Sequence, residues 1–348
     1  SKAMRILALL ALAQACSAFS PSPTPFGHSA ASLRPASAAT SPRTAPSGGL
    51  LGLRLADAGY GWTNRPPTSI SSDNVREAAA RVSVSGTVSI QGAEIKYDYL
   101  PGDGPTVMYL PALNRTRHGG VANSLKAWCR GQGRSFLVAD YFGVGQSEGD
   151  YKDASISRWN DDTCTLIEWL GKEHGQTEVV VVGAGVGGWV MLHAAQKMAA
   201  SVVGLVGVAA DPDFTEDLVM PNLSDDVKKK IMDEGSSEFE WGGKTYTLTK
   251  TMVEDGKAMT LLDKGDKSID VDCPVHLIQG LGDEEIPPEK ALRLSECIKG
   301  DEVVITYVKH GSHELESEAD FKRIHASISE IDRYLGKLSW SRSIRAPV

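Results

Sequence analysis

The stretch Val179-Val-Val-Val-Gly183-Ala-Gly185-Val-Gly187-Gly188-Trp-Val-Met-Leu192 decides the fold of this chain. Its four consecutive valines are typical of a strand that is buried on both faces. The glycines allow a tight turn, and the apolar residues after them continue at helical spacing. We therefore expect a strand, a sharp turn and a helix over residues 179–200.

Two chemical interpretations fit this turn. Gly183, Gly185 and Gly188 satisfy GxGxxG, the pattern that cradles the phosphates of a dinucleotide. The same segment also fits the G-x-S-x-G nucleophile elbow, the strand–turn–helix that presents the reactive serine of some hydrolases, with glycine at position 185 instead of serine. Both interpretations require a tight connection, so residues elsewhere must distinguish them.

The residues after the turn favour the hydrolase interpretation. A dinucleotide site needs an acidic residue about 20 residues past the glycines, where this chain has Leu205–Val208. About five predicted strands also precede Gly183, whereas the fingerprint normally belongs to the first strand of its unit. A catalytic triad on the hydrolase fold needs a nucleophile, an acid and a base in that order. Asp283 and His313 follow position 185 in this order, each just after a predicted strand.

Short apolar runs alternate with helical patterns along most of the chain. We expect an antiparallel hairpin near residues 82–100, followed by a mostly parallel sheet covered by helices, which is an α/β fold. The runs expected to form the later strands are Val107–Leu110, Phe136–Ala139, Val179–Val182, Val202–Val208, Val275–Ile278 and Val303–Val308.

The expected domain organisation is a core that is interrupted once and preceded by a leader. Residues 211–272 break the alternation, so we interpret them as a cap inserted between two sheet strands. The predicted parts are a signal peptide (1–18), a disordered low-complexity transit segment (19–67), a linker (68–80), the first part of the core (81–210), the cap (211–272), the second part of the core (273–336) and a tail (337–348).

The first 67 residues have the composition of a targeting sequence. A basic start is followed by the apolar run Ile6–Ala13 and by Cys16-Ser-Ala18, which has small residues suited to cleavage. The next segment is rich in Ser, Pro, Ala and Thr, and such a composition cannot form a core. This combination resembles a bipartite plastid presequence. Secretion and the mitochondrion are the alternatives.

Composition and charge limit the partners of the body of the chain. The 348 residues include 36 basic and 44 acidic side chains, and five of the basic residues precede the first acidic residue, Asp57. The remainder therefore has 31 basic and 44 acidic residues, a net charge of −13. Such an acidic body argues against nucleic acid or an anionic membrane as a partner. The five cysteines show no metal-ligand spacing and no disulfide pattern, so we expect no metal and no other cofactor. No apolar run after residue 18 approaches the length of a membrane span, so no stable anchor is expected after leader cleavage.

Five motifs, of which the turn segment is one, support the hydrolase interpretation and occur in register: Tyr109–Leu113, Asp140–Ser147, Gly183–His193, Gly280–Asp283 and Gly311–His313. With these motifs, residues 84–336 resemble the branch of the α/β-hydrolases that contains mitochondrial palmitoyl-protein thioesterase, also described as an acyl-glucuronide esterase. The resemblance implies a serine hydrolase acting on a small acyl ester or thioester, or on an acylated protein. The departure is large, because the serine of that family maps onto Gly185.

The resemblance also implies a role for each site residue. A serine at position 185 would attack the acyl carbon, His313 would accept its proton, and Asp283 would orient the imidazole. The backbone N–H groups of Val186 and Leu113 would stabilise the oxyanion, and they do not depend on the side chain at Gly185.

Neighbouring residues offer rivals to these assignments. His310 is a second candidate base, but the motif register favours His313. Glu284 and Glu285 are fallback acids that we expect to be solvated. Three residues of the cap either line an acyl pocket or pack within the cap: Trp241, Tyr246 and Met252.

Glycine at position 185 leaves several functions open. Loss of the nucleophile in a triad enzyme lowers kcat by roughly 10⁶-fold. The chain is then an inactive or strongly impaired form of a thioesterase or carboxylesterase. One alternative is a natural pseudoenzyme that binds an acyl or other apolar ligand. In another, His313 and Asp283 activate a water molecule or a substrate proton. A dinucleotide-dependent oxidoreductase is the distant alternative.

Overall fold

The computed structural model describes the backbone of residues 82–345 and the side chains of residues 82–337. The predicted signal peptide (1–18), transit segment (19–67) and linker (68–80) lie outside the described residues. Most of the predicted tail (337–348) continues the last helix as far as Arg345.

The helices and strands alternate along the chain, as the apolar runs predict. They are β1 (Val84–Ile90), β2 (Ala93–Leu100), β3 (Asp103–Leu110), α3 (Gly120–Gln132), β4 (Arg134–Ala139), η1 (Tyr151–Asp153), α4 (Ile156–His174), β5 (Val179–Ala184), α5 (Val186–Lys197), β6 (Val202–Val208), η2 (Phe214–Val219), α6 (Met220–Asn222), α7 (Asp225–Glu234), β7 (Ser236–Trp241), β8 (Lys244–Thr249), α8 (Lys250–Ala258), η3 (Leu262–Lys264), β9 (Val275–Gly280), α9 (Glu289–Cys297), β10 (Val303–Val308) and α10 (Glu318–Arg345). η1 and η3 are single 3-10 turns, and η2 is π-helical.

Eight strands form the main sheet in the order β1-β2-β4-β3-β5-β6-β9-β10. β1 pairs antiparallel with β2, and β2 pairs antiparallel with β4. All the other neighbouring strands run parallel. The prediction of a mostly parallel sheet behind an antiparallel hairpin is therefore confirmed. β5 lies between β3 and β6, so the turn that follows it opens at the middle of the sheet edge.

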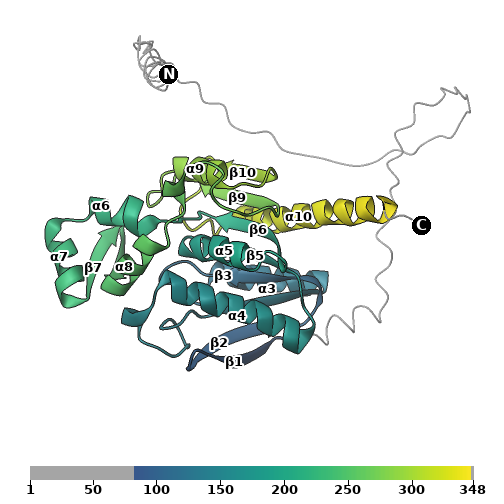
Figure 1. Cartoon of the computed structure of the whole chain (residues 1–348), viewed down its shortest axis with the longest axis horizontal. Helices are drawn as coiled ribbons and strands as arrows, with labels where there is room; N and C mark the ends of the chain where they lie inside the picture. Colours follow the sequence, from purple (N-terminus) through teal and green to yellow (C-terminus); the bar gives the residue numbers. More distant parts are fainter. Residues whose placement is uncertain (1–81, 346–348) are drawn as a thin grey trace, which may run out of the picture. The chain divides into compact units, whose positions relative to one another are not determined.

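Helices cover both faces of the sheet (Figure 1). Val179 and Val181 of β5 face an apolar cluster that includes residues of α4 and α5, whereas Val180 and Val182 face a cluster with residues of α3 and α10. Because all four valines are fully buried on alternating faces, the continuous apolar run in the sequence is explained.

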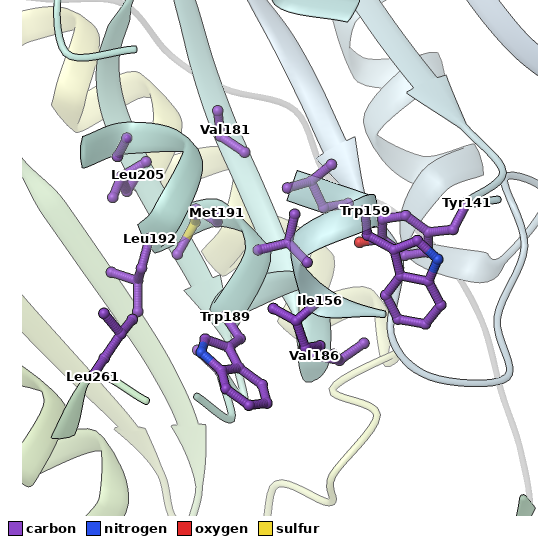
Figure 2. Close-up of a cluster of buried hydrophobic side chains, with 14 of the residues drawn as sticks. Tyr141, Ile156, Trp159, Val181, Val186, Trp189, Met191, Leu192, Leu205 and Leu261 are labelled. Carbon is purple, nitrogen blue, oxygen red and sulfur yellow. The ribbon is translucent and has the colours of Figure 1, made fainter. Parts of the chain in front are cut away.

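The cluster beneath α4 and α5 holds the turn after β5 in place (Figure 2). Trp159 of α4 stacks on Tyr141 with 4.5 Å between the ring centroids. Trp189 of α5 is fully buried, and its indole N–H donates to the carbonyl of Met259 at 3.1 Å. Burying these large aromatic rings fixes α5 against the sheet and against the end of α8.

A separate group of elements lies between β6 and β9, where the sequence predicts a cap at residues 211–272. It contains α6, α7 and α8 and the two-stranded antiparallel hairpin β7–β8, which group to one side of the main sheet (Figure 1). The two ends of this segment are joined by Asp213, whose carboxylate accepts the backbone N–H groups of Leu261 and Leu262 at 2.9 and 2.6 Å.

Candidate active site

The turn between β5 and α5 has the backbone shape of a nucleophile elbow. Gly185 has φ 49° and ψ −119°, a conformation that residues with a side chain rarely adopt. Its N–H donates to the carbonyl of Val208 at 3.1 Å, and its carbonyl accepts the N–H groups of Gly188 and Asp211. The turn is therefore fixed by backbone hydrogen bonds on both sides of residue 185.

The glycines around Gly185 serve close packing. A Cβ atom at Gly183 would lie 2.4 Å from the carbonyl oxygen of Gly187, and a Cβ atom at Gly187 would lie 2.2 Å from that of Leu110. At Gly188 a Cβ atom would lie 2.5 Å from the Cβ of Ala210. Close contact between the strand and the helix thus explains why glycines occur at these positions, so the match to GxGxxG does not require a bound phosphate.

Asp283 lies on the loop after β9 with its side chain fully buried. One carboxylate oxygen accepts the backbone N–H groups of Glu285 and Ile286, both at 2.9 Å. The other oxygen accepts the Gln279 side-chain amide at 3.0 Å and faces Nδ1 of His313 at 3.2 Å. Burial raises the pKa of Asp283, but the His313 bond and charge and the two backbone N–H groups outweigh it, so the pKa lies below its usual value.

His313 lies on the loop after β10, and its side chain is 16% exposed. This loop approaches β9 so closely that a Cβ atom at Gly280 would lie 2.2 Å from the carbonyl oxygen of Gly311. Burial lowers the pKa of His313, whereas the hydrogen bond and charge of Asp283 and the charge of Glu285 raise it. The net pKa lies above its usual value. The rival base His310 is exposed at the surface.

Two backbone N–H groups remain available near the turn. Val186 is the first residue of α5, so its N–H has no acceptor within the helix. Leu113 follows β3 by three residues. Neither group donates a hydrogen bond to another residue of the part that the structure describes. Both residues line the same cavity as Gly185, as the oxyanion interpretation requires.

A cavity of about 330 Å³ joins these parts. It is lined by Gly185, Val186, Leu113 and His313. Asp283 contacts Nδ1 of His313 and does not itself line the cavity. The apolar wall of the cavity includes Phe214 and Val219 of η2, Phe239 and Trp241 of β7, and Val121 of α3. The structure therefore brings together every site residue predicted from the sequence, around one partly apolar cavity.

The fold described above superposes on those of solved structures. A crystal structure of an Agrobacterium vitis protein superposes with a TM-score of 0.65 at 29% identity, over 72% of this chain and 98% of that one. Mouse alpha/beta hydrolase domain-containing protein 10 superposes with a TM-score of 0.63 at 24% identity, over 73% of this chain and 99% of that one. The chain has the α/β-hydrolase fold.

The sequence comparisons match this chain to a family model and to named relatives. The family described as serine aminopeptidase, S33 matches residues 115–234. Palmitoyl-protein thioesterase ABHD10, mitochondrial, of Rattus norvegicus is 28% identical over 249 residues, covering 70% of this chain and 80% of the relative. The Homo sapiens protein of the same name is 27% identical over 248 residues, with 70% and 78% coverage. These names agree with the mitochondrial alternative for the location of the protein and give no support to the plastid.

One expectation about the candidate site is wrong. Glu285 is buried rather than solvated, because the cap hairpin covers it, whereas Glu284 is exposed. The Glu285 carboxylate pairs with Lys244 and accepts a hydrogen bond from the Tyr246 hydroxyl at 2.6 Å. One of its oxygens lies 3.6 Å from Nε2 of His313. The sequence carries only a weak signal for this contact, since the Gly-Gly turn that brings the hairpin close lies about 40 residues earlier.

Two further features of the described residues concern membrane spans and metal sites. Within residues 82–345, no helix is long and apolar enough to span a bilayer. No cluster of three or more His, Cys, Asp or Glu side chains suited to a metal ion occurs among the described residues. Cys129, Cys164, Cys273 and Cys297 are free thiols, and burial raises the pKa of Cys129 to about 12.

Proposed function

We propose that this α/β-hydrolase binds acyl thioesters or carboxylic esters in the cavity beside Gly185, and that it hydrolyses them poorly or not at all as its sequence stands. One observation carries the proposal. The turn at Gly185 keeps the backbone shape that presents a nucleophile, and it faces the Asp283–His313 pair across a partly apolar cavity. The names of the thioesterase relatives support the substrate class.

The chemistry that the site would perform with serine at position 185 follows from the contacts. The serine Oγ would bond to the acyl carbon while Nε2 of His313 takes its proton, and Asp283 would stabilise the resulting imidazolium. The N–H groups of Val186 and Leu113 would hold the negative oxygen of the tetrahedral intermediate. His313 would return the proton to the departing thiol or alcohol, and water would then release the acid by the same two proton transfers.

Without the serine, the groups that would bind the ligand are retained. The apolar wall can bury an acyl chain, and the cavity volume falls in the range of small-molecule sites. The two backbone N–H groups can hold the ester carbonyl whatever side chain occupies position 185. We therefore propose an acyl ester or thioester, either free or attached to a protein, as the ligand.

The decisive experiment restores the nucleophile. The Gly185→Ser variant should hydrolyse p-nitrophenyl esters and palmitoyl-CoA. The same variant protein should react covalently with a fluorophosphonate, which intact-mass spectrometry detects. Gly185→Ala is the matched control, because it adds the same Cβ atom without a hydroxyl. Equal inactivity of the two variants, without fluorophosphonate labelling of the serine form, would contradict a retained hydrolase site.

Binding without turnover has its own test. Saturated acyl ligands should raise the melting temperature of the unsubstituted protein in proportion to the logarithm of ligand concentration above Kd. Replacing Phe239 of the apolar wall with Asp should remove this shift, whereas replacing the exposed Val82 with Asp should preserve it.

A second candidate is hydrolysis by an activated water molecule. It is favoured by the position of His313, which lines the cavity while Asp283 holds its other nitrogen. This function predicts a slow activity of the unsubstituted protein that His313→Ala abolishes. If the unsubstituted protein and His313→Ala both hydrolyse the ester no faster than buffer does, this second function is excluded and ligand binding without hydrolysis is the function that is left.

We also propose an organellar address, with the mitochondrion favoured by the names of the relatives. The leader that would carry this address lies outside the described residues. Fusion of residues 1–80 to a fluorescent protein tests the address, and retention of the fusion in the cytosol would contradict it.

A further inference from the structure

Glu285 lies on the far side of the His313 ring from Asp283. Its Oε2 atom is 3.6 Å from Nε2 of His313, and Oδ2 of Asp283 is 3.2 Å from Nδ1. The first distance is that of an ion pair, and the second that of a hydrogen bond. The imidazole therefore has a carboxylate near each nitrogen, and a protonated ring gains from both.

The same Glu285 side chain anchors the β7–β8 hairpin. Lys244 pairs with one carboxylate oxygen, and the Tyr246 hydroxyl donates to the other at 2.6 Å. The indole N–H of Trp241 also donates to the Glu285 backbone carbonyl at 3.0 Å. Gly242, at the tip of the hairpin, has φ 53°, and a Cβ atom there would lie 2.1 Å from Cγ of Glu285. The hairpin thus reaches its position over the cavity by direct contact with Glu285.

We propose that Glu285 is a positioning residue that links closure of the cap hairpin to protonation of His313. Protonated His313 repels Lys244 and competes with it for the Glu285 carboxylate, so the hairpin packs most firmly when the ring is neutral. Protonation of the ring therefore weakens the contact between the hairpin and Glu285. Linkage is reciprocal, so the packed hairpin in turn favours the neutral ring.

The charged groups around His313 give this linkage its sign. Asp283 and Glu285, both on the loop after β9, favour the charged ring, and Lys244 of the hairpin opposes it. Glu314, on the loop of His313 itself, pairs with Lys244 and with Arg115. The carboxylate of Asp211, after β6, is paired with Lys290. The direct neighbours of the ring are thus two carboxylates and one ammonium, so removing Glu285 should lower the His313 pKa.

The consequence for catalysis rests on the proposed function, but the linkage itself can be measured without hydrolysis. In the unsubstituted protein, the ring protons of His313 can be titrated by NMR, with His313→Gln used to assign the signal. Glu285→Gln should lower the His313 pKa by at least about half a unit, because an opposite charge within about 4 Å is lost. Glu284→Gln is the matched control, since it removes the neighbouring carboxylate at an exposed position.

A substitution of opposite sign keeps the test independent of one variant's folding. Lys244→Met removes the cation near the ring, so the His313 pKa should rise. If Glu285→Gln does not fold, as judged by circular dichroism, this second variant carries the test. An unchanged His313 pKa in a folded variant would overturn the linkage.

The hairpin provides the second readout. Hydrogen-exchange protection of residues 236–249 should rise as pH rises through the His313 pKa, and Glu285→Gln should remove this pH dependence because the carboxylate for which the two cations compete is lost. Protection that is equally pH-dependent with and without Glu285 would also overturn the proposal. Because neither measurement involves turnover, both outcomes remain interpretable if Gly185→Ser proves inactive.

Discussion

A Cβ atom at position 185 would lie 3.3 Å from the Cβ of Ala112, and its next contact is the Cα of the same residue at 3.8 Å. Ala112 need move only a few tenths of an ångström to admit a small side chain. The strained backbone is the larger obstacle, because φ at Gly185 is 49°. The site therefore has room for a serine, and glycine relieves the strain that a serine would bear.

Gly185→Ser should lower the free energy of unfolding by about 1–3 kcal/mol, the cost of a side chain in a strained conformation. Gly185→Ala should lower it by a similar amount, since both variants add a Cβ atom in the same place. Urea unfolding of the three proteins measures the difference. A variant as stable as the parent would show that the turn is not strained.

The activity gained in Gly185→Ser should depend on both partners of the pair. Adding His313→Ala or Asp283→Asn should lower kcat by about 10³-fold or more, because the serine loses its base or the base loses its orientation. Adding His310→Ala is the control, since His310 is exposed at the surface. Similar losses from His310 and His313 would contradict the assignment of the base.

The pH profile of Gly185→Ser should follow His313. Asp283 and Glu285 hold the pKa of His313 above its usual value, and only the neutral ring can accept the serine proton. The value of kcat/KM should therefore rise with pH, with a midpoint above 6.5. Asp283, whose pKa is lowered, stays ionised throughout. A midpoint below 6.5 in the pH profile of ester hydrolysis, measured in single-turnover assays, would contradict a raised pKa of His313.

The same shifts act on stability. Because the folded-state pKa of His313 is raised, its contribution is complete below pH 6.5 and is lost as pH rises through that raised pKa. The contribution of Asp283, whose pKa is lowered, is complete above pH 3.8 and is lost as pH falls through that lowered pKa. Urea unfolding of the parent and of His313→Gln between pH 5 and 9 should show a difference that shrinks as pH rises. A constant difference would contradict the shift.

The hairpin tip provides a matched pair of glycines. Gly243→Ala should cost about 1–2 kcal/mol, because φ is 74° and a Cβ atom there meets nothing within 4 Å. Gly242→Ala should cost more and should expose β7–β8 to limited proteolysis, since its Cβ atom would overlap Glu285. Equal cleavage rates in the two variants would show that the hairpin does not depend on this contact.

Much of the site follows from local sequence. The four valines before Gly183 indicate a doubly buried strand, and a buried strand brings the turn after it to the sheet edge. Asp283 and His313 each follow a strand of the same parallel sheet, so their loops open at the same edge. The order of the elements, combined with the nucleophile–acid–base order of a triad, therefore predicts that Asp283 and His313 lie at the edge where the Gly185 turn opens.

Glu285 shows where that reasoning stops. Its local sequence suggests a solvated acid next to an exposed one, Glu284, and nothing within several residues distinguishes the two. Its burial is decided by Lys244 and Tyr246, which arrive from about 40 positions away in a separate hairpin.

The amino-acid sequence by itself determined the sheet, the turn at Gly185 and the missing hydroxyl, because apolar periodicity and glycine placement act over a few neighbouring residues. Only the tertiary structure decided that Glu285 is buried against His313, because that contact depends on how the inserted segment packs over the sheet edge. Burial and charge pairing of this kind arise from long-range packing, and no local pattern encodes them.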